Sequence, residues 1–307
     1  MRTIDWVDGA IELVDQTKLP GELVMLRVTT VDELVGAIRR LSVRGAPALG
    51  VAGALGVVLA GGDQAAIARL RAARPTAVNL AWGVDRVAAA GDPLKAALRI
   101  RDDDLAASRA MGERGAGLLE GDRLRIMTIC NTGGLAAVER GTALSVVQTL
   151  HERARLAEVL ALETRPLLQG ARLTTWELAR MGAPHRLVID SAGPYLLARG
   201  GVDAVLIGAD RIAANGDTAN KIGSYALALG AERAGVPFIV VAPESTIDQA
   251  APSGDHIAIE DRAADEVLTI GGVRLAPDGT DALNPAFDVT PHDLITAIVT
   301  ERRVIRP

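Results

Sequence analysis

The segment LRIMTICNTGG, residues 124–134, is a mostly apolar run that ends in a cysteine and a glycine-rich polar turn. The same pattern recurs along the second part of the chain, and it predicts strands at Leu124–Ile129, Glu158–Glu163, Arg186–Ile189, Ala204–Gly208 and Pro237–Val241. Helices are predicted after them, from Gly134 to Val138 onward and over Arg172–Met181, Tyr195–Ala198 and Lys221–Ala234. Strands that alternate with helices predict an α/β fold, with a Rossmann-like parallel sheet in a domain over residues 116–307.

Residues 1–115 have a different pattern, which predicts a mainly helical N-terminal domain with a small β segment at its start. The expected elements are a strand at Met25–Thr29, a helix capped by Thr30 or Asp32, a Gly/Ala-rich helix at Ala48–Leu59, a loop over 72–79 and a helical stretch over Leu94–Leu119. The change of pattern near residues 115–121 predicts the boundary between the two domains.

The composition limits the classes of partner. Hydrophobic residues make up 49% of the 307 residues and aromatic residues only 2%, so a large core of aliphatic side chains is expected. The formal net charge is -5 and there is no basic run. Proteins that bind nucleic acid usually present a basic stripe or stacking aromatics. We therefore expect no nucleic-acid partner, whereas a small anion needs only a few local cations.

The sequence also predicts a cytoplasmic protein. Cys130 is the single cysteine, so no disulfide can form within the chain. The first residues, MRTIDWVDGAIELVDQ, lack an apolar stretch of the signal-peptide type. The most apolar window, 46–60, is shorter than the roughly 20 residues that span a bilayer, so no membrane association is expected.

Reactive side chains follow several of the predicted strands, where ligands bind in open parallel sheets. Cys130 follows one strand and precedes a predicted helix, whose N-terminus would lower the thiol pKa; a buried structural cysteine is the alternative. Asp210 follows the run AVLIGA, where partial burial would raise the pKa of a carboxyl enough to donate a proton. Arg211 beside it could oppose that shift, and a turn-capping aspartate is the alternative.

Other polar residues are candidates for holding an anion or hydroxyl groups. Asn220 and Lys221 are predicted to open a helix, a position where amides and a cation can bind phosphate. Arg44, Gly45 and Ala46 precede Pro47 at the start of another helix and form a second candidate anion site. Two further candidates are Arg74, as a phosphate clamp, and Gln169, as a ligand of substrate hydroxyls. Ordinary helix caps and solvated surface side chains are the alternatives at these positions.

No metal or cofactor is expected. The four histidines show no metal-ligand spacing, and no aspartate spacing requires Mg²⁺. The first strand of the predicted sheet is not followed by GxGxxG, which disfavours a dinucleotide-dependent oxidoreductase, and there is no Walker A loop.

Taken together, these segments resemble the methylthioribose-1-phosphate isomerases, which are relatives of the regulatory subunits of a eukaryotic translation-initiation exchange factor. The resemblance extends over almost the whole chain. It rests on DQTKLP (15–20), VRGAPALGVAGA (43–54), ICNTGGLA (129–136), ETRPLLQGARLTTWEL (163–178), GADRIAANGDTANKIGSYALA (208–228), PFIVVAPESTID (237–248) and NPAFDVTPHDLITAIVTERRVIRP (284–307).

The resemblance implies an aldose–ketose isomerase of the methionine salvage pathway. It would be a homodimer, without a cofactor, that acts on a small phosphorylated sugar. The family's essential cysteine falls on Cys130 and its proton-donating aspartate on Asp210. Its substrate contacts fall on Arg44, Gly45, Ala46, Arg74, Gln169, Asn220 and Lys221.

The chain departs from the family pattern at Ile129, Gly134, Ser191 and Ala192, and it is shorter between Ala46 and Arg74. Because these changes are expected to surround the pocket, they bear on the sugar more than on the reaction. Two alternatives stay open at this point. One is a related isomerase that acts on 5-deoxyribose 1-phosphate or ribose 1,5-bisphosphate, and the other is a non-catalytic regulatory or binding protein of the same fold.

Overall fold

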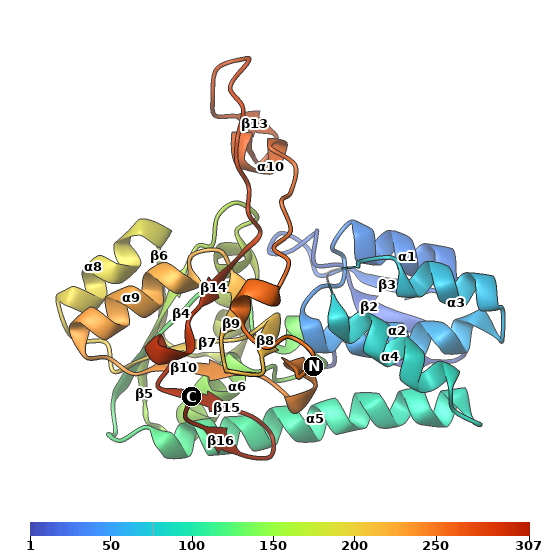
Figure 1. The fold of residues 1–307 in the computed structure, drawn as a ribbon, viewed down its shortest axis with the longest axis horizontal. Coiled ribbons are helices and arrows are strands. Elements are labelled where there is room, and N and C mark those ends of the chain that lie inside the picture. The colour runs from blue at the N-terminus through green and yellow to red at the C-terminus, as the bar shows by residue number, and fades with distance from the viewer. Residues whose placement is uncertain (76) are drawn as a thin grey trace.

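The computed structural model describes residues 1–75 and 77–307, and its elements form two groups that lie side by side (Figure 1). The first group contains an antiparallel sheet and five helices. The sheet is β1 (Ile4–Val7), β2 (Ala10–Val14) and β3 (Met25–Val28), in that order. The helices are α1 (Val31–Arg39), α2 (Ala46–Ala60), α3 (Gln64–Arg71), α4 (Val78–Ala88) and α5 (Pro93–Leu118). None of the helices in the described ranges is long and apolar enough to cross a membrane.

Local sequence explains how these helices start and pack. Thr30 caps α1 in a capping box with Glu33, which confirms one of the two predicted caps. The central helix α2 is buried along most of its length. It approaches α4 so closely that a Cβ atom at Gly83 would collide with the backbone carbonyl of Gly50. This contact leaves no room for a side chain at Gly83, so the approach of the two helices depends on glycine at that position.

The second group is built on a seven-stranded sheet in the order β16-β15-β10-β7-β4-β5-β6. Its strands from β15 to β6 are parallel, and the edge strand β16 is antiparallel to β15. The strands are β4 (Leu124–Thr128), β5 (Leu156–Leu162), β6 (His185–Val188), β7 (Ala204–Ile207), β10 (Phe238–Val241), β15 (Ala297–Val299) and β16 (Val304–Ile305). The predicted α/β fold with a parallel sheet is therefore confirmed.

Helices cover both faces of this sheet, so its central strands are buried on both sides. Successive residues of β4, such as Ile126 and Met127, belong to two different apolar clusters, one on each face of the sheet. One cluster includes side chains of α5, α6 (Ala143–Glu152) and α7 (Thr175–Met181). The other includes side chains of α8 (Gly193–Ala198) and α9 (Ser224–Ala234). This double coverage explains why the sequence of these strands is mostly apolar without a clear alternation.

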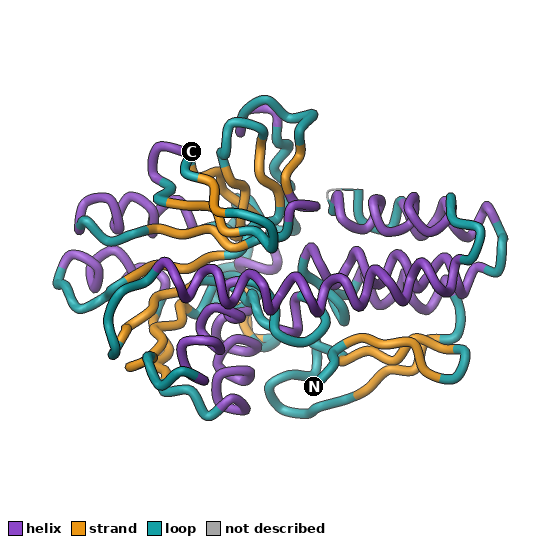
Figure 2. The backbone as a smooth tube through the Cα atoms, turned by 90° about the horizontal axis from the view of Figure 1, so that it is seen from below, coloured by secondary structure: helices purple, strands orange, loops and turns teal. Residues whose placement is uncertain are grey.

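The long helix α5 links the two groups, and Figure 2 shows it running across both. Ala97 and Ile100, near its start, pack in the core around α2. Met111 and Ala116, near its end, pack beneath the parallel sheet. The predicted boundary at residue 115 falls within this helix, and the division into two domains stays a prediction.

A four-stranded sheet that the sequence analysis missed lies beside the parallel sheet. Its order is β11-β8-β9-β14, with β8 (Arg211–Ala213), β9 (Thr218–Lys221), β11 (Ile247–Asp248) and β14 (Phe287–Thr290). The prediction that Asn220 and Lys221 open a helix is wrong. They end strand β9, opposite Asp288 and Phe287 of β14, and α9 begins only at Ser224. A small projecting unit, α10 (Asp265–Leu268) with β12 (Thr269–Ile270) and β13 (Val273–Arg274), extends from the chain before β14 (Figure 1).

Two other predicted segments differ from the structure. The helix expected from Gly134 is only a short turn, Gly134–Ala136, and the next helix begins at Ala143. The chain must turn back here, because the Thr142 amide donates to the Thr132 carbonyl and Gly141 has a positive φ of 82°. The predicted loop over 72–79 ends earlier than expected, since α4 starts at Val78.

The close approach of α2 and α4 generates a stability prediction. We expect Gly83→Ala to lower the free energy of unfolding by about 1–3 kcal/mol, because the added methyl group overpacks a contact made by backbone atoms. Gly117→Ala, in an open position on α5, is the matched control and should be neutral or stabilising. Urea denaturation of both variants measures the difference, and equal effects would contradict the packing argument.

Candidate active site

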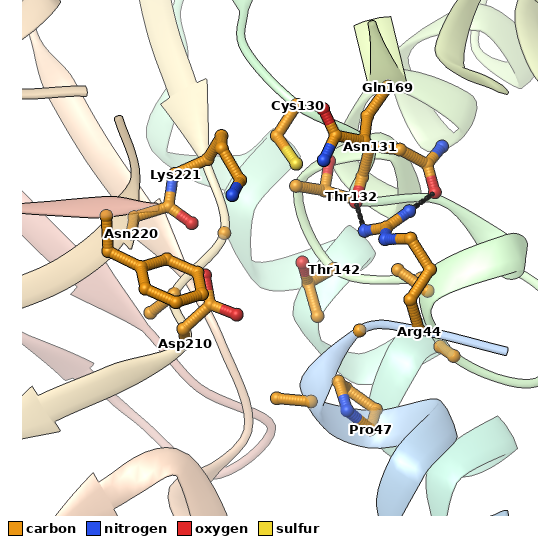
Figure 3. A pocket seen from close by; sticks show the side chains of 18 of the residues that line it. Arg44, Pro47, Cys130, Asn131, Thr132, Thr142, Gln169, Asp210, Asn220 and Lys221 are labelled. Carbon is orange, nitrogen blue, oxygen red and sulfur yellow. Dashed lines mark hydrogen bonds between the residues drawn. The ribbon is translucent and has the colours of Figure 1, made fainter. Parts of the chain in front are cut away.

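All nine candidate residues from the sequence line one pocket, between the carboxyl ends of the parallel strands and the start of α2. They are Arg44, Gly45, Ala46, Arg74, Cys130, Gln169, Asp210, Asn220 and Lys221. Figure 3 shows Asp210, Asn220 and Lys221 on one side of the pocket. Cys130, Gln169 and Arg44 lie on the other, so a ligand in the pocket would sit between the thiol and the carboxyl.

Cys130 is held rigidly where β4 ends. Its φ is 63°, a conformation that is uncommon outside glycine. Its backbone N–H donates to the Thr164 hydroxyl at 2.8 Å, and its carbonyl accepts from the Thr174 hydroxyl at 2.6 Å. The expected helix dipole is absent here, because the next α-helix starts at Ala143. The nearby positive charge comes instead from Lys221, which interacts electrostatically with Cys130.

Asp210 lies opposite, just beyond β7, with its backbone N–H bonded to the Ala219 carbonyl at 2.9 Å. Burial raises the pKa of its carboxyl, and the positive charges of Lys221, Arg74 and Arg44 oppose that rise. Arg211, which could oppose this rise if it pointed toward the carboxyl, pairs with Asp248 at 3.7 Å. A carboxyl with a raised pKa can hold a proton and donate it to a substrate.

Arg44 is aimed by Asn131, whose side-chain and backbone oxygens each accept a hydrogen bond from the guanidinium at 2.8 Å. The Asn131 amide nitrogen in turn donates to Glu177 at 2.7 Å, which fixes the orientation of that amide. Burial raises the pKa of Glu177, and hydrogen bonds from Asn131 and two backbone amides oppose the rise. Glu177 and Asn131, in series, therefore hold the Arg44 guanidinium at the pocket.

The start of α2 brings backbone N–H groups to the same place. Gly45 caps the helix with a φ of 93°, and a Cβ atom there would lie 2.6 Å from Ala136, so only glycine fits. The N–H groups in the first turn of a helix have no intrahelical acceptor. Together with Arg44 and Arg74, they form a site suited to phosphate.

Lys221, Asn220 and Gln169 complete the polar lining. The Lys221 ammonium donates to the Ala286 carbonyl at 2.7 Å and lies 4.4 Å from the Phe287 ring centre. Burial lowers its pKa, whereas Cys130 and Asp210 act to raise it. The Asn220 amide donates to the Ser224 hydroxyl at 2.9 Å. Gln169 is 5% exposed, and its side-chain oxygen has no partner in the described part of the chain, so it is available to a ligand.

A second cavity continues from this pocket and shares Gly45, Ala46, Arg74, Asp210 and Phe287 with it. We call it the annex. Its other polar lining residues are Asn79 and Arg211. The rest of its lining is apolar: Leu49, Ala77, Val78, Ala219, Ile257, Ala258 and Ile259. Leu49 belongs to the predicted apolar helix, whereas Ile257 and Ile259 carried no signal in the sequence.

The sequence analysis also missed Thr132, Thr142, Arg262 and Phe287, which line the main pocket. Thr132 belongs to a polar segment at a strand end, so its position gave a signal. Phe287 lies in the family motif over 284–307 but was not assigned a role, and Arg262 lies in no motif. The four departures from the family pattern do not surround the pocket as expected. Ile129, Gly134, Ser191 and Ala192 are all absent from its lining in residues 1–75 and 77–307. Ile129 is instead part of an apolar core.

Comparison with known proteins places these features in a family. Residues 42–307 match the model of the initiation factor 2 subunit family. A 5-deoxyribose 1-phosphate isomerase of Moorella thermoacetica is 50% identical over 99% of this chain and 94% of the relative. A probable bifunctional methylthioribose-1-phosphate isomerase/methylthioribulose-1-phosphate dehydratase of Nocardia farcinica is 53% identical over 99% of this chain. This chain spans only 60% of that longer relative.

A solved structure supports the same relationship. The 5-methylthioribose 1-phosphate isomerase from Pyrococcus horikoshii OT3 superposes with a TM-score of 0.93 and is 41% identical, covering 100% of this chain and 92% of the other. Both the fold and the sequence are therefore shared along the whole described chain. The chain belongs to the initiation factor 2 subunit family, on the branch that resembles the sugar-phosphate isomerases.

Proposed function

We propose that this chain is an aldose–ketose isomerase that converts 5-methylthioribose 1-phosphate to 5-methylthioribulose 1-phosphate. The observation that carries the proposal is the placement of Cys130 and Asp210 on opposite sides of one pocket that also holds Arg44, Arg74 and Lys221. Relatives at about half identity are named as isomerases of methylthioribose 1-phosphate or 5-deoxyribose 1-phosphate. A purely regulatory protein would have no need of an acid and a thiol facing one another.

Asp210 would open the sugar ring. A phosphate on the anomeric carbon blocks the spontaneous ring opening that free aldoses undergo, so the enzyme must supply a proton to the ring oxygen. Burial raises the pKa of the Asp210 carboxyl, which favours the protonated form that this step needs. When the C1–O bond breaks, the ring oxygen leaves as the C4 hydroxyl and C1 becomes electron-deficient.

Hydrogen then moves from C2 to C1, on the side of the sugar that faces Cys130. In one route Cys130 removes the C2 proton and an enol phosphate forms, which is then protonated at C1. In the other, hydride passes directly from C2 to C1 and Cys130 shields the reacting face. In both routes the C2 hydroxyl loses its proton and becomes the ketone, and that proton restores Asp210. The substrate and product are isomers, so no cofactor is needed for balance.

The remaining residues would hold the substrate. Arg44, Arg74 and the free amides near Gly45 and Ala46 are placed to bind the phosphate. Gln169, Asn220 and Lys221 are placed to bind the sugar hydroxyls. Positioning of this kind can contribute as much to the rate as the acid and base themselves.

The annex supports an apolar group at C5. Most of its lining is aliphatic, which suits a methylthio or methyl group and offers little to a second phosphate beyond Arg74 and Arg211. Arg211 is already paired with Asp248. We therefore place ribose 1,5-bisphosphate below 5-methylthioribose 1-phosphate and 5-deoxyribose 1-phosphate as a substrate.

We also infer a cytosolic homodimer whose protomers divide into domains at residues 1–115 and 116–307. Exposed apolar side chains on β6, on the residue after it, and on α8 and α9 support the dimer, and these elements lie at one end of the molecule in Figure 1. The side chains are Leu187, Ile189, Tyr195, Tyr225 and Leu229. β6 is also an edge strand of the parallel sheet. Apolar patches of this kind usually mark protein contacts.

Variants of the two central residues test the reaction. We expect Cys130→Ser and Asp210→Asn each to lower kcat by about 10²–10⁴-fold while folding normally, since general acid and base groups contribute on that scale. Asp102→Asn changes an exposed acid on α5, outside the main pocket and the annex, and should retain activity. Phosphorus NMR follows conversion of the anomeric phosphate to the ketose 1-phosphate. A decrease in kcat of less than about tenfold would contradict the proposed catalytic role of that residue.

A panel of three sugar phosphates tests the annex. We expect wild-type kcat/KM to be highest for 5-methylthioribose 1-phosphate and lowest for ribose 1,5-bisphosphate. Val78→Phe, which fills the annex, should lower kcat/KM about tenfold more for the methylthio sugar than for the smaller 5-deoxy sugar. The 5-deoxy sugar is the control within the same variant. Equal losses on both would show that the C5 group lies elsewhere.

Light scattering tests the dimer. We expect the wild-type protein to have twice the mass of the chain, and Leu187→Glu to shift it toward the monomer because a charge is placed on the apolar patch. Leu283→Glu, on a fully exposed side chain outside that patch, is the matched control and should leave the mass unchanged. A wild-type monomer at micromolar concentration would refute the dimer.

A further inference from the structure

Thr132 carries a hydroxyl group that the fold buries without pairing. The residue is 6% exposed and lines the main pocket two positions after Cys130. Its Oγ1 finds no hydrogen-bond partner among residues 1–75 and 77–307. Buried hydroxyl groups usually have a hydrogen-bond partner, so one that lacks a partner in a pocket wall is a candidate for binding a ligand.

The unpaired hydroxyl of Thr132 contrasts with the polar groups around it, which have hydrogen-bond partners. Both backbone polar groups of Cys130 are bonded to threonine hydroxyls. Asn131 uses its side chain and its carbonyl to hold Arg44 and Glu177. The Thr132 carbonyl itself accepts from the Thr142 amide at 2.8 Å. Residues 130–132 are therefore held in place and all line the pocket, and the Thr132 hydroxyl is the oxygen among their side chains that has no partner in the described residues.

The orientation of Thr132 is fixed by its methyl group. A Cβ atom at Gly208 would lie 2.9 Å from Thr132 Cγ2, so the glycine leaves just enough room for that methyl group. Because Cγ2 packs against Gly208, the hydroxyl, which is bonded to the same Cβ atom, points in a different direction from Gly208. Figure 3 shows the Thr132 side chain in the pocket wall between Cys130 and Arg44. That position lies between the groups assigned to the reacting carbons and to the phosphate.

We propose that the Thr132 hydroxyl is a further substrate-binding group, which forms a hydrogen bond with an oxygen of the bound sugar phosphate close to C1. The proposal rests on the proposed function for the identity of the ligand. A hydroxyl both donates and accepts, so it can bind a phosphate oxygen or the C2 hydroxyl. In either case it fixes C1 and C2 relative to Cys130, and the free energy of this contact is gained only when the substrate is present.

Two substitutions separate the hydroxyl from the shape of the side chain. Thr132→Val keeps the shape and removes the hydroxyl, and we expect kcat/KM to fall about 10- to 100-fold. Thr132→Ser keeps the hydroxyl and should remain within about threefold of wild type. Thr128→Val is the matched control, because Thr128 is also buried with an unpaired hydroxyl in β4 but does not line the pocket. It should leave kcat/KM unchanged.

A stability measurement distinguishes substrate binding from a structural role. If the hydroxyl serves only the substrate, Thr132→Val should have a urea midpoint equal to or above that of wild type, since an unpaired buried group has been removed. Wild-type kcat/KM in Thr132→Val, or a loss of stability that accounts for its lower activity, would overturn the proposal.

Binding of 5-methylthioribose 1-phosphate by calorimetry separates this proposal from the proposed reaction. If the wild-type protein binds the sugar phosphate but does not convert it, the isomerase proposal fails. The Thr132 contact is then supported by a weaker Kd in Thr132→Val and overturned by an equal Kd. If the wild-type protein does not bind the sugar phosphate, both proposals fail. Where the Thr132 contact is supported, inhibition of substrate binding by inorganic phosphate identifies the oxygen that Thr132 contacts. Only a contact with a phosphate oxygen makes Thr132→Val less sensitive to this inhibition than the wild-type protein.

Discussion

The central constraint on this structure is that several charged side chains lie close together around one partly enclosed pocket. Arg44, Arg74 and Lys221 act electrostatically on Asp210, whose carboxyl is itself held toward the neutral form by burial. Removing charges from water is costly unless they are paired. An excess of positive charge beside an acid of raised pKa is the arrangement that a bound anion would stabilise. Holding these positive charges in the pocket therefore lowers the stability of the folded chain, and binding of the substrate phosphate would offset this loss.

Distant parts of the chain must meet for this pocket to form. Arg44 and the start of α2 belong to the first group of elements, whereas Cys130 and Asp210 follow strands of the parallel sheet. The approach of Gly45 to Ala136 and the hydrogen bonds from Arg44 to Asn131 join the two groups directly at the pocket. The α5 helix holds them together elsewhere, because its two ends pack in different cores. The pocket therefore forms only when the first and second groups of elements pack against each other.

Much of this arrangement follows from local sequence, and the rest does not. Strands buried on both faces give long apolar runs, so the parallel sheet and the residues at its ends were predictable. The second sheet was not predictable, because its strands are short. The residues of β9, which include Asn220 and Lys221, directly precede an apolar helical pattern, so the sequence alone also fits a helix that begins there. The annex depends on Ile257 and Ile259, in a segment without periodicity. Only tertiary packing brings such residues to the site.

Local conformation also departs from the usual preferences where the chemistry is expected. Cys130, Thr164 and Leu168 all have positive φ, although none is glycine, and all three follow the ends of β4 and β5. Conformations of this kind persist only where surrounding contacts impose them. Here the Thr164 hydroxyl bonds the Cys130 amide, so one strained residue supports another. Of these three residues Cys130 lines the pocket, so a strained backbone and the unpaired Thr132 hydroxyl lie in one segment of the pocket wall, as expected of a segment shaped for a ligand.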